Sequence, residues 1–272
     1  MHEGIFRGEG FEVPLLRADV IPPGFHHGFS TRRGGVSEAP FDSLNLGGRW
    51  GDDAAAIAEN RRRFEAAAGG GPVHFARQVH GRGVAHVSAE TRPDEVAAVA
   101  ADAVVTAAPR TAVGVYVADC TPIVIADART GACAAVHAGW RGTVARVVTA
   151  ALGALIDTYG SRPRDLRMAV GPVIGPCCFE VGPEVVAEVE AAFPAARAAG
   201  AITLPPRSLR EHVDLARLNR AAALEVGLAP EAIEVAGLCT RCEADRFYSY
   251  RRDGGRTGQL AAFVTFDPDR AG

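Results

Sequence analysis

Residues 112–142 read AVGVYVADCTPIVIADARTGACAAVHAGWRG, and this stretch decides what kind of fold to expect. Three short runs rich in Val, Ile and Ala follow one another at 112–118, 122–127 and 132–137, with brief polar connections between them. They show little alternation of polar and apolar residues, which is typical of strands that are covered on both faces. We therefore predict buried strands with other layers of structure packed against them.

The segment that follows predicts a helix. Its apolar residues fall on one stripe at helical spacing, with Gly160 as the stop: Val144, Val147, Val148, Ala151, Leu152, Leu155 and Ile156. We expect one long helix whose N-terminus lies just beyond Trp140 and Arg141. The unpaired N–H groups and the positive dipole end of such a helix would favour an anion there.

Strands and helices alternate along the rest of the chain. Strands are predicted at 24–30, 73–79, 83–88, 102–106, 166–170 and 232–238, with two more joined by a glycine-rich turn in 247–264, and helices at about 53–68, 183–192 and 214–225. This pattern favours an α/β (α+β) fold, a single domain over residues 1–272 with mixed β-sheets flanked by helices. The linker-like residues 199–212 are interpreted as an excursion from one core.

Composition and charge exclude several classes of protein. The chain has 272 residues, 48% of them hydrophobic, and a formal net charge of -3. It lacks the basic footprint of a nucleic-acid-binding protein, and Arg61–Arg63 are interpreted as a solvated helix face. The N-terminus does not look like a secretory signal, and the longest apolar run, 147–156, is too short to span a membrane. We expect a cytoplasmic protein with no membrane or nucleic-acid partner.

Three motifs place a His or Cys at the end of a short apolar run: RQVHG (77–81), ADC (118–120) and VHAGWRG (136–142). His80, Cys120 and His137 make a plausible Cys-His-His set for zinc, with a fourth position open for water or substrate. Two other interpretations remain open at this point. The three residues could simply be packed and hydrogen-bonded at strand ends, or Cys120 could be a nucleophile with His137 or His80 as its base.

Four further residues are candidates for binding a polar or anionic substrate. Arg141, at the expected helix start, could hold phosphate or stack on Trp140, and Arg32, in a glycine-rich loop, is a second possible anion contact. Asn45 could recognise a ligand or close a turn. Asp119 could orient a histidine or face solvent.

The six cysteines are at 120, 133, 177, 178, 239 and 242. In a long chain without an export signal, thiols used for metal binding, catalysis or packing are favoured over disulfides. Cys239 and Cys242 form a CxxC, for which Cys177 and Cys178 are the only candidate partners. We do not favour a second, structural metal site, since adjacent cysteines are not expected to chelate one ion in a regular geometry.

Eight stretches taken in order resemble a known family: HGFSTRRGGVS, SLNLGGRWGDD, RQVHG, ADAVVT, ADCTPIVIAD, AVHAGWRGT, GPVIGPCCFEVG and FYSYRRDGGRTG. Together they closely resemble the laccase-domain or YfiH-type family, over about residues 24–265. Its members, known as polyphenol oxidases, are now regarded as purine nucleoside phosphorylases with adenosine deaminase side activity.

The resemblance implies a function and a cofactor. It implies one α/β domain with one zinc held by His80, Cys120 and His137. It also implies phosphorolysis of adenosine, inosine, guanosine and methylthioadenosine to a free base and ribose 1-phosphate, and it leaves a role with cell-wall precursors open. The chain departs from the family where an arginine is expected and Gln259 stands instead. An anion role for that arginine would fall to Arg251, Arg252 or Arg256, or be absent.

Three alternative functions are carried forward. A copper-dependent polyphenol oxidase is disfavoured because the chain has eight histidines, of which only His26 and His27 lie close together. The others are a hydrolase centred on Cys120 and a non-enzymatic peptidoglycan-editing factor.

Overall fold

The strands predicted from residues 112–138 form where expected, as β7 (Ala112–Val117), β8 (Thr121–Asp127) and β9 (Cys133–Ala138). β8 and β9 are antiparallel neighbours, and every residue of both is buried. β7 lies in a different sheet, so the chain crosses from one sheet to the other at residues 118–120. Cys120 stands at this crossing.

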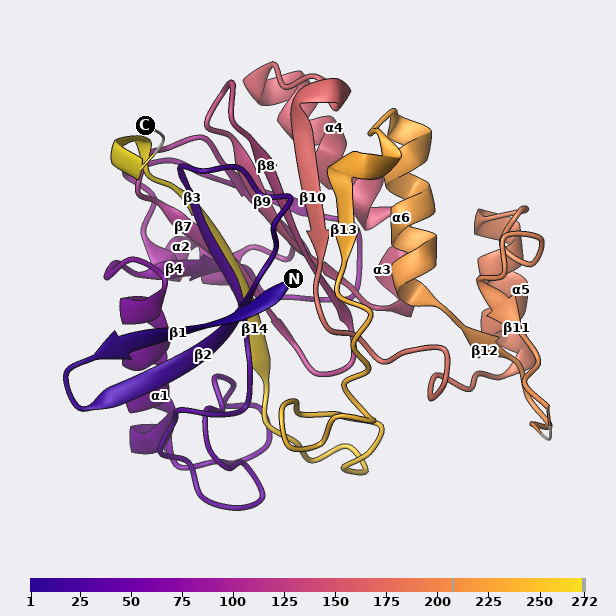
Figure 1. Ribbon diagram of the computed structural model, residues 1–272, viewed down its shortest axis with the longest axis horizontal. Coiled ribbons are helices and arrows are strands. Elements are labelled where there is room, and N and C mark those ends of the chain that lie inside the picture. The colour runs from indigo at the N-terminus through magenta and orange to yellow at the C-terminus, as the bar shows by residue number, and fades with distance from the viewer. Residues whose placement is uncertain (207, 271–272) are drawn as a thin grey trace.

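The computed structural model describes residues 1–206 and 208–270 and contains two six-stranded mixed sheets (Figure 1). The first has the order β1-β2-β3-β14-β7-β4 and adds β1 (His2–Gly8), β2 (Phe11–Arg17), β3 (Phe25–Ser30), β4 (Val73–Phe75) and β14 (Leu260–Phe266) to β7. The second has the order β13-β10-β8-β9-β6-β5 and adds β5 (Val84–Val87), β6 (Ala103–Thr106), β10 (Leu166–Val170) and β13 (Ile233–Val235).

The two sheets pack on each other and are covered outside by helices. Val113 and Val115 of β7 share one buried cluster with Val124 of β8 and Ala135 of β9. The outer face of the second sheet packs on α4 (Val147–Tyr159) and α6 (Leu215–Val226), and that of the first on α1 (Ala54–Ala67). Each sheet is thus covered on both faces, which explains the lack of alternation in the sequence.

The remaining elements are short. They are α2 (Pro93–Ala98), α3 (Trp140–Val144), α5 (Pro183–Ala192), β11 (Ile202–Thr203), β12 (His212–Val213) and three 3-10 turns at Pro163–Asp165, Pro230–Ala232 and Pro268–Arg270. β11 and β12 pair with each other and lie with α5 at one side of the molecule, as Figure 1 shows. Residues 199–206 and 208–212 therefore lie outside the two six-stranded sheets. Among the described residues, none of the helices combines the length and the apolarity needed to cross a membrane.

The prediction of one long helix after Arg141 is wrong. The chain forms the five-residue α3, passes through Arg146 in a left-handed conformation (φ 63°), and only then begins α4. Arg146 is held in this break because its guanidinium lies 3.6 Å from the centre of the Phe193 ring and pairs with Glu225 at 2.6 Å. The dipole of the long helix α4 therefore starts beyond Arg146 and not at Trp140.

Two other predictions need correction. The segment 247–264 forms one strand, β14, where we expected two, because residues 247–258 fold into turns whose polar groups bind Asp119 and Asp253. The hairpin of β1 and β2 was not predicted; β1 is the edge strand of its sheet and has no buried residue. The capped start of α1 agrees with the sequence, as Asp53 accepts the N–H of Ala56 at 2.8 Å.

Candidate metal centre and active-site cavity

His80, Cys120 and His137 come together although they are far apart in sequence. Their potential ligand atoms all lie within 4.8 Å of one another. The rings of His80 and His137 meet edge to face, with centroids 4.8 Å apart and an interplanar angle of 81°. Each residue comes from a different part of the fold: the turn after residue 79, the crossing between β7 and β8, and the end of β9. The structure thus forms the juxtaposition on which the zinc interpretation depends.

The buried carboxylate of Asp102 holds two of these residues in place. It accepts three consecutive backbone N–H groups, from Val79 (3.2 Å), His80 (2.9 Å) and Gly81 (2.7 Å). These bonds fix the turn in which His80 adopts a left-handed conformation (φ 60°), unusual for a residue with a side chain. Sequence reasoning missed Asp102. Its signal was an acid placed directly before the apolar run of ADAVVT.

Asp102 also orients the His137 ring. One carboxylate oxygen lies 2.7 Å from Nδ1 of His137, and the side chain of His137 is only 3% exposed. Since an ionised carboxylate can only accept, Nδ1 carries a proton and Nε2 is left as the atom available to a metal. Such carboxylate–histidine pairs are the usual support of metal-binding imidazoles.

The three groups shift each other's ionisation. Burial opposes charge on the Cys120 thiol, but the neighbouring His137 and the hydrogen bonds from both imidazoles outweigh it and lower the pKa of the thiol. Burial likewise opposes charge on His137, but Cys120 and Asp102 raise the pKa of its imidazole. The cluster therefore favours a thiolate at Cys120, which is the form that binds a metal or acts as a nucleophile.

Gly139 leaves the room that this cluster needs. A Cβ at this position would lie 3.0 Å from Sγ of Cys120 and 3.1 Å from Cδ2 of His80. Its backbone conformation (φ -67°) is one that any residue can adopt. The requirement for glycine in VHAGWRG is thus set by space beside the Cys-His-His cluster.

The cluster lies at the wall of a cavity of about 720 Å³. Besides the three clustered residues, the lining includes arginines and aromatic rings, namely Arg49, Arg141, Arg210, Arg251, Trp50, Tyr116, Trp140, Phe179 and Tyr250. Arg141 is exposed and stacks on Trp140, 4.2 Å from the ring centre. Within the described chain, neither Arg49 nor Arg141 forms an ion pair with an acidic residue, so both guanidinium groups are available to an anion.

The other residues singled out from the sequence have protein partners. Arg32 lies outside the cavity lining, pairs with Asp42 at 3.1 Å and stacks on Tyr248. Asn45 is buried and closes its own turn, since its amide bonds the backbone of Gly47 in both directions. These contacts favour a structural role for Arg32 and the turn interpretation for Asn45.

Asp119 lines the cavity but neither orients a histidine nor faces solvent. Its carboxylate accepts Oγ1 of Thr240 (2.6 Å), Oγ of Ser249 (3.0 Å) and the backbone N–H of Arg251 (2.7 Å). It therefore fastens the C-terminal loops to the crossing that carries Cys120. Gln259, which stands where an arginine was expected, also lines the cavity.

Comparison with known proteins agrees with these observations. The sequence is 41% identical over 256 residues to a purine nucleoside phosphorylase of Deinococcus radiodurans, which covers 93% of this chain and 92% of the relative. It is also 41% identical over 237 residues to the purine nucleoside phosphorylase Rv2149c of Mycobacterium tuberculosis, covering 86% and 89%.

Solved structures share the fold. The crystal structure of the hypothetical protein YfiH of Bacillus licheniformis superposes with a TM-score of 0.84 at 30% identity, covering 89% of this chain and 93% of that one. YlmD of Geobacillus stearothermophilus superposes with a TM-score of 0.79 at 30% identity, covering 96% and 98%. Residues 26–267 match the model of the family described as multi-copper polyphenol oxidoreductase laccase. The chain therefore belongs to this laccase-domain family, the one that its ordered motifs resemble.

Proposed function

We propose that this protein is a zinc-dependent purine nucleoside phosphorylase that also deaminates adenosine. The observation that carries the proposal is the Cys-His-His cluster at the wall of an arginine-lined cavity, in a chain 41% identical to relatives named purine nucleoside phosphorylases. The proposed substrates are adenosine, inosine, guanosine and methylthioadenosine, and the second substrate is phosphate. The cavity volume is within the range of sites that enclose a small-molecule ligand.

The donor set fits zinc. One thiolate and two imidazoles are ligands that zinc prefers, and three protein ligands are typical of a catalytic site with an open position. Mononuclear copper also binds two histidines and a cysteine, usually with a weak axial methionine. Neither of the chain's methionines, Met1 and Met168, lines the cavity. His26 and His27 are buried and engaged by Arg17 and Ala18, so they do not add to a copper cluster.

The chain's own residues would prepare phosphorolysis. Arg141 and Arg49 attract and orient the phosphate so that one of its oxygens can attack C1′ while the purine leaves. The aromatic lining offers flat faces for the purine. Asp102 holds the His137 ring through Nδ1, which leaves Nε2 as the nitrogen that would bind a metal. When bound, a zinc ion supplies Lewis acidity and an open coordination position at this wall.

The direct test is product formation from inosine. Zinc-loaded protein should release hypoxanthine and ribose 1-phosphate when phosphate is present and neither product when phosphate is left out. Absence of both products in phosphate, for protein shown to hold its metal, would refute the proposal. With adenosine, inosine formation measures the deaminase activity separately.

Arg141→Ala tests the phosphate contact. It should raise KM for phosphate more than KM for inosine, because it removes a cation that stands at the cavity without an acidic partner. Arg62→Ala is the matched control, since Arg62 lies exposed on α1 and pairs with Glu59 instead. Equal kinetics in the Arg141 and Arg62 variants would place the phosphate elsewhere.

The alternatives predict different results. A copper oxidase would take up oxygen with a phenol after copper loading in the absence of zinc. A hydrolase centred on Cys120 would be alkylated at that thiol at the same rate with and without zinc. A peptidoglycan-editing factor would keep its cellular role after loss of His137.

A further inference from the structure

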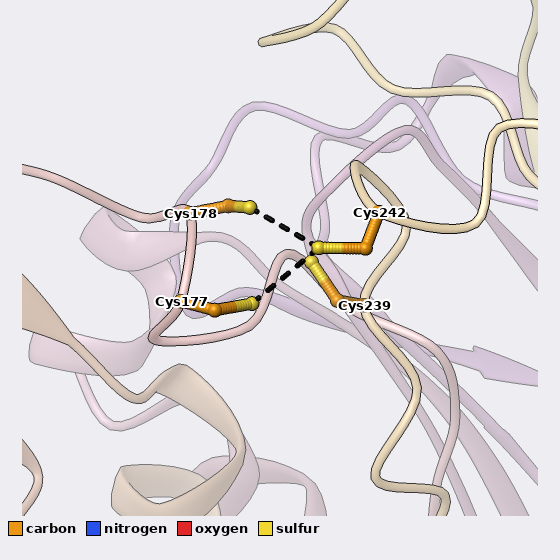
Figure 2. Close-up of side chains that lie close together, drawn as sticks. All are labelled: Cys177, Cys178, Cys239 and Cys242. Carbon is orange, nitrogen blue, oxygen red and sulfur yellow. Dashed lines mark hydrogen bonds between the residues drawn. The ribbon is translucent and has the colours of Figure 1, made fainter.

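The structure gathers four cysteines at a second place. Cys177, Cys178, Cys239 and Cys242 offer sulfur atoms that all lie within 4.8 Å of one another (Figure 2). We call them the four-cysteine cluster. None of them belongs to the Cys-His-His cluster or lines the cavity. The adjacency of Cys177 and Cys178 does not keep their sulfur atoms apart, contrary to the reason for which a second metal site was not favoured.

The backbone brings the two pairs together without help from the thiols. β10 and β13 are parallel neighbours, and the isolated parallel bridge of Val173 with Cys239 continues their pairing beyond the strands. The N–H of Thr240 bonds the carbonyl of Val173 at 3.1 Å. The loops that leave these strands therefore run side by side, one carrying Cys177 and Cys178 and the other the CxxC.

Adjacent cysteines can converge here because they lie in a turn. Successive side chains point to opposite sides in a strand but not in a turn. Residues 176–178 form a turn in which the N–H of Cys178 bonds the carbonyl of Gly175 at 2.9 Å. Figure 2 shows the side chains of Cys177 and Cys178 extending from this turn toward Cys239 and Cys242.

The spacing of the sulfur atoms fits one tetrahedral ion. A zinc–sulfur distance of about 2.3 Å places the sulfurs of a tetrahedral site about 3.8 Å apart. Sγ of Cys242 lies 3.7 Å from that of Cys177 and 3.4 Å from that of Cys178. A disulfide needs about 2.05 Å. The thiols are thus spaced for a shared ion and not as bonded pairs.

Two hydrogen-bond donors face the sulfur atoms of the cluster. The backbone N–H of Gly175 donates to Sγ of Cys239 at 3.2 Å, and the Arg241 guanidinium donates to Sγ of Cys178 at 3.5 Å. Such donors offset the net negative charge that four thiolates leave on a divalent ion. A Cβ on Gly175 would lie 3.3 Å from Sγ of Cys177, so glycine also keeps the space between the pairs open.

We propose that the four-cysteine cluster binds a structural zinc ion. Four thiolates fill the coordination of the ion, so the site has no open position for substrate. Its place in the fold suggests what it stabilises. Phe179 follows Cys178 directly and lines the cavity, while the loop after Cys242 carries Tyr250 and Arg251, and the Arg251 guanidinium lies 5.4 Å from the centre of the Phe179 ring. The ion fastens these two segments to each other.

Zinc content tests the proposal independently of activity. Protein purified under reducing conditions with zinc and then dialysed should lose one zinc per chain in Cys239→Ser/Cys242→Ser relative to the unsubstituted protein. Cys133→Ala is the matched control, because Cys133 is buried in β9 outside the cluster, and it should keep all its zinc. Cys120→Ser/His137→Ala should keep the zinc of the four-cysteine cluster, which separates this site from the proposed active centre.

Alkylation of the unsubstituted protein covers the case in which the double variant does not fold. Cys177 and Cys242 are exposed, yet they should react slowly with iodoacetamide when zinc is bound and rapidly after chelation. Any one of four results would overturn the proposal. The first two are equal zinc content in the cluster variant and the unsubstituted protein, and equally rapid alkylation with and without zinc. The other two are disulfides between these cysteines in the reduced preparation, and iron in place of zinc. Failure to cleave inosine would leave these readouts unchanged.

Discussion

Replacing Asp102 by Asn should weaken both the hydrogen bonds that hold the turn of His80 and the hydrogen bond that orients the His137 ring. One carboxylate oxygen accepts the N–H of His80 and faces Nδ1 of His137, and the other accepts the N–H groups of Val79 and Gly81. An amide has only one oxygen, so its NH₂ group must face one of these two pairs. If the NH₂ group faces Val79 and Gly81, both of their N–H groups lose their acceptor; if it faces His80 and His137, the N–H of His80 does.

The expected magnitude follows from this count. An unsatisfied buried donor costs about 1–3 kcal/mol, so the loss of an acceptor by one or two partly buried donors should lower the free energy of unfolding by about 1–6 kcal/mol. If the NH₂ group faces His137, the ring must take the other tautomer and can no longer present Nε2 as a ligand. Loss of such a supporting partner typically weakens metal binding roughly 10- to 100-fold.

Two measurements check this prediction. Denaturant unfolding of the metal-free protein gives the free energy, and competition with a chelator gives the zinc affinity of the Cys-His-His cluster, measured in the Cys239→Ser/Cys242→Ser background. Asp127→Asn is the matched control for affinity, because Asp127 is equally buried but bonds the backbone of Arg129, away from this cluster. Unfolding within about 0.5 kcal/mol of the parent protein, the range of an ordinary surface substitution, together with unchanged zinc affinity, would refute the assignment of Asp102 as a positioning residue.

Two further predictions rest on close packing and on burial. Gly139→Ala should weaken zinc binding at the Cys-His-His cluster with little cost in backbone strain, because its Cβ would crowd Cys120 and His80; chelator competition measures this, and an unchanged affinity would contradict it. Burial lowers the pKa of His27 to about 4, below its unfolded value of about 6.5. The contribution of His27 to the free energy of unfolding is therefore fully present above pH 6.5, where the ring is neutral in both states. As the pH falls from 6.5 toward 4, the free energy of unfolding decreases by about 3 kcal/mol. His27→Gln keeps an acceptor for the N–H of Ala18 and should flatten the pH dependence of the unfolding free energy over this window; an equally steep dependence would show that His27 is not its source.

Much of the fold could be predicted because it depends on local pattern. The buried runs at 112–118, 122–127 and 132–137 became β7, β8 and β9 almost residue for residue. The break between α3 and α4 could not be predicted, since the apolar stripe continues through it. It depends on a contact of Arg146 with Phe193, which lies far along the chain.

The candidate site could be predicted as far as its residues lie at the ends of strands. His80, Cys120 and His137 each follow or close an apolar run, and that position is visible in the sequence. Asp102 is equally close to a strand, but its function depends on which N–H groups the fold turns toward it. The four-cysteine cluster depends on the parallel pairing of β10 with β13, whose strands are separated by two helices and a small sheet along the chain.

Asp119 connects the two clusters, and this connection explains why both lie at the same part of the fold. Asp119 directly precedes Cys120 and adopts a left-handed conformation (φ 81°). It is held there by Thr240, which lies between the two cysteines of the CxxC, and by Ser249 and Arg251 of the next loop. The position of the Cys120 thiolate therefore depends on the loop that the four-cysteine cluster fastens. A structural ion in that cluster would act on the proposed active centre by fixing the backbone that carries one of its ligands, without touching substrate.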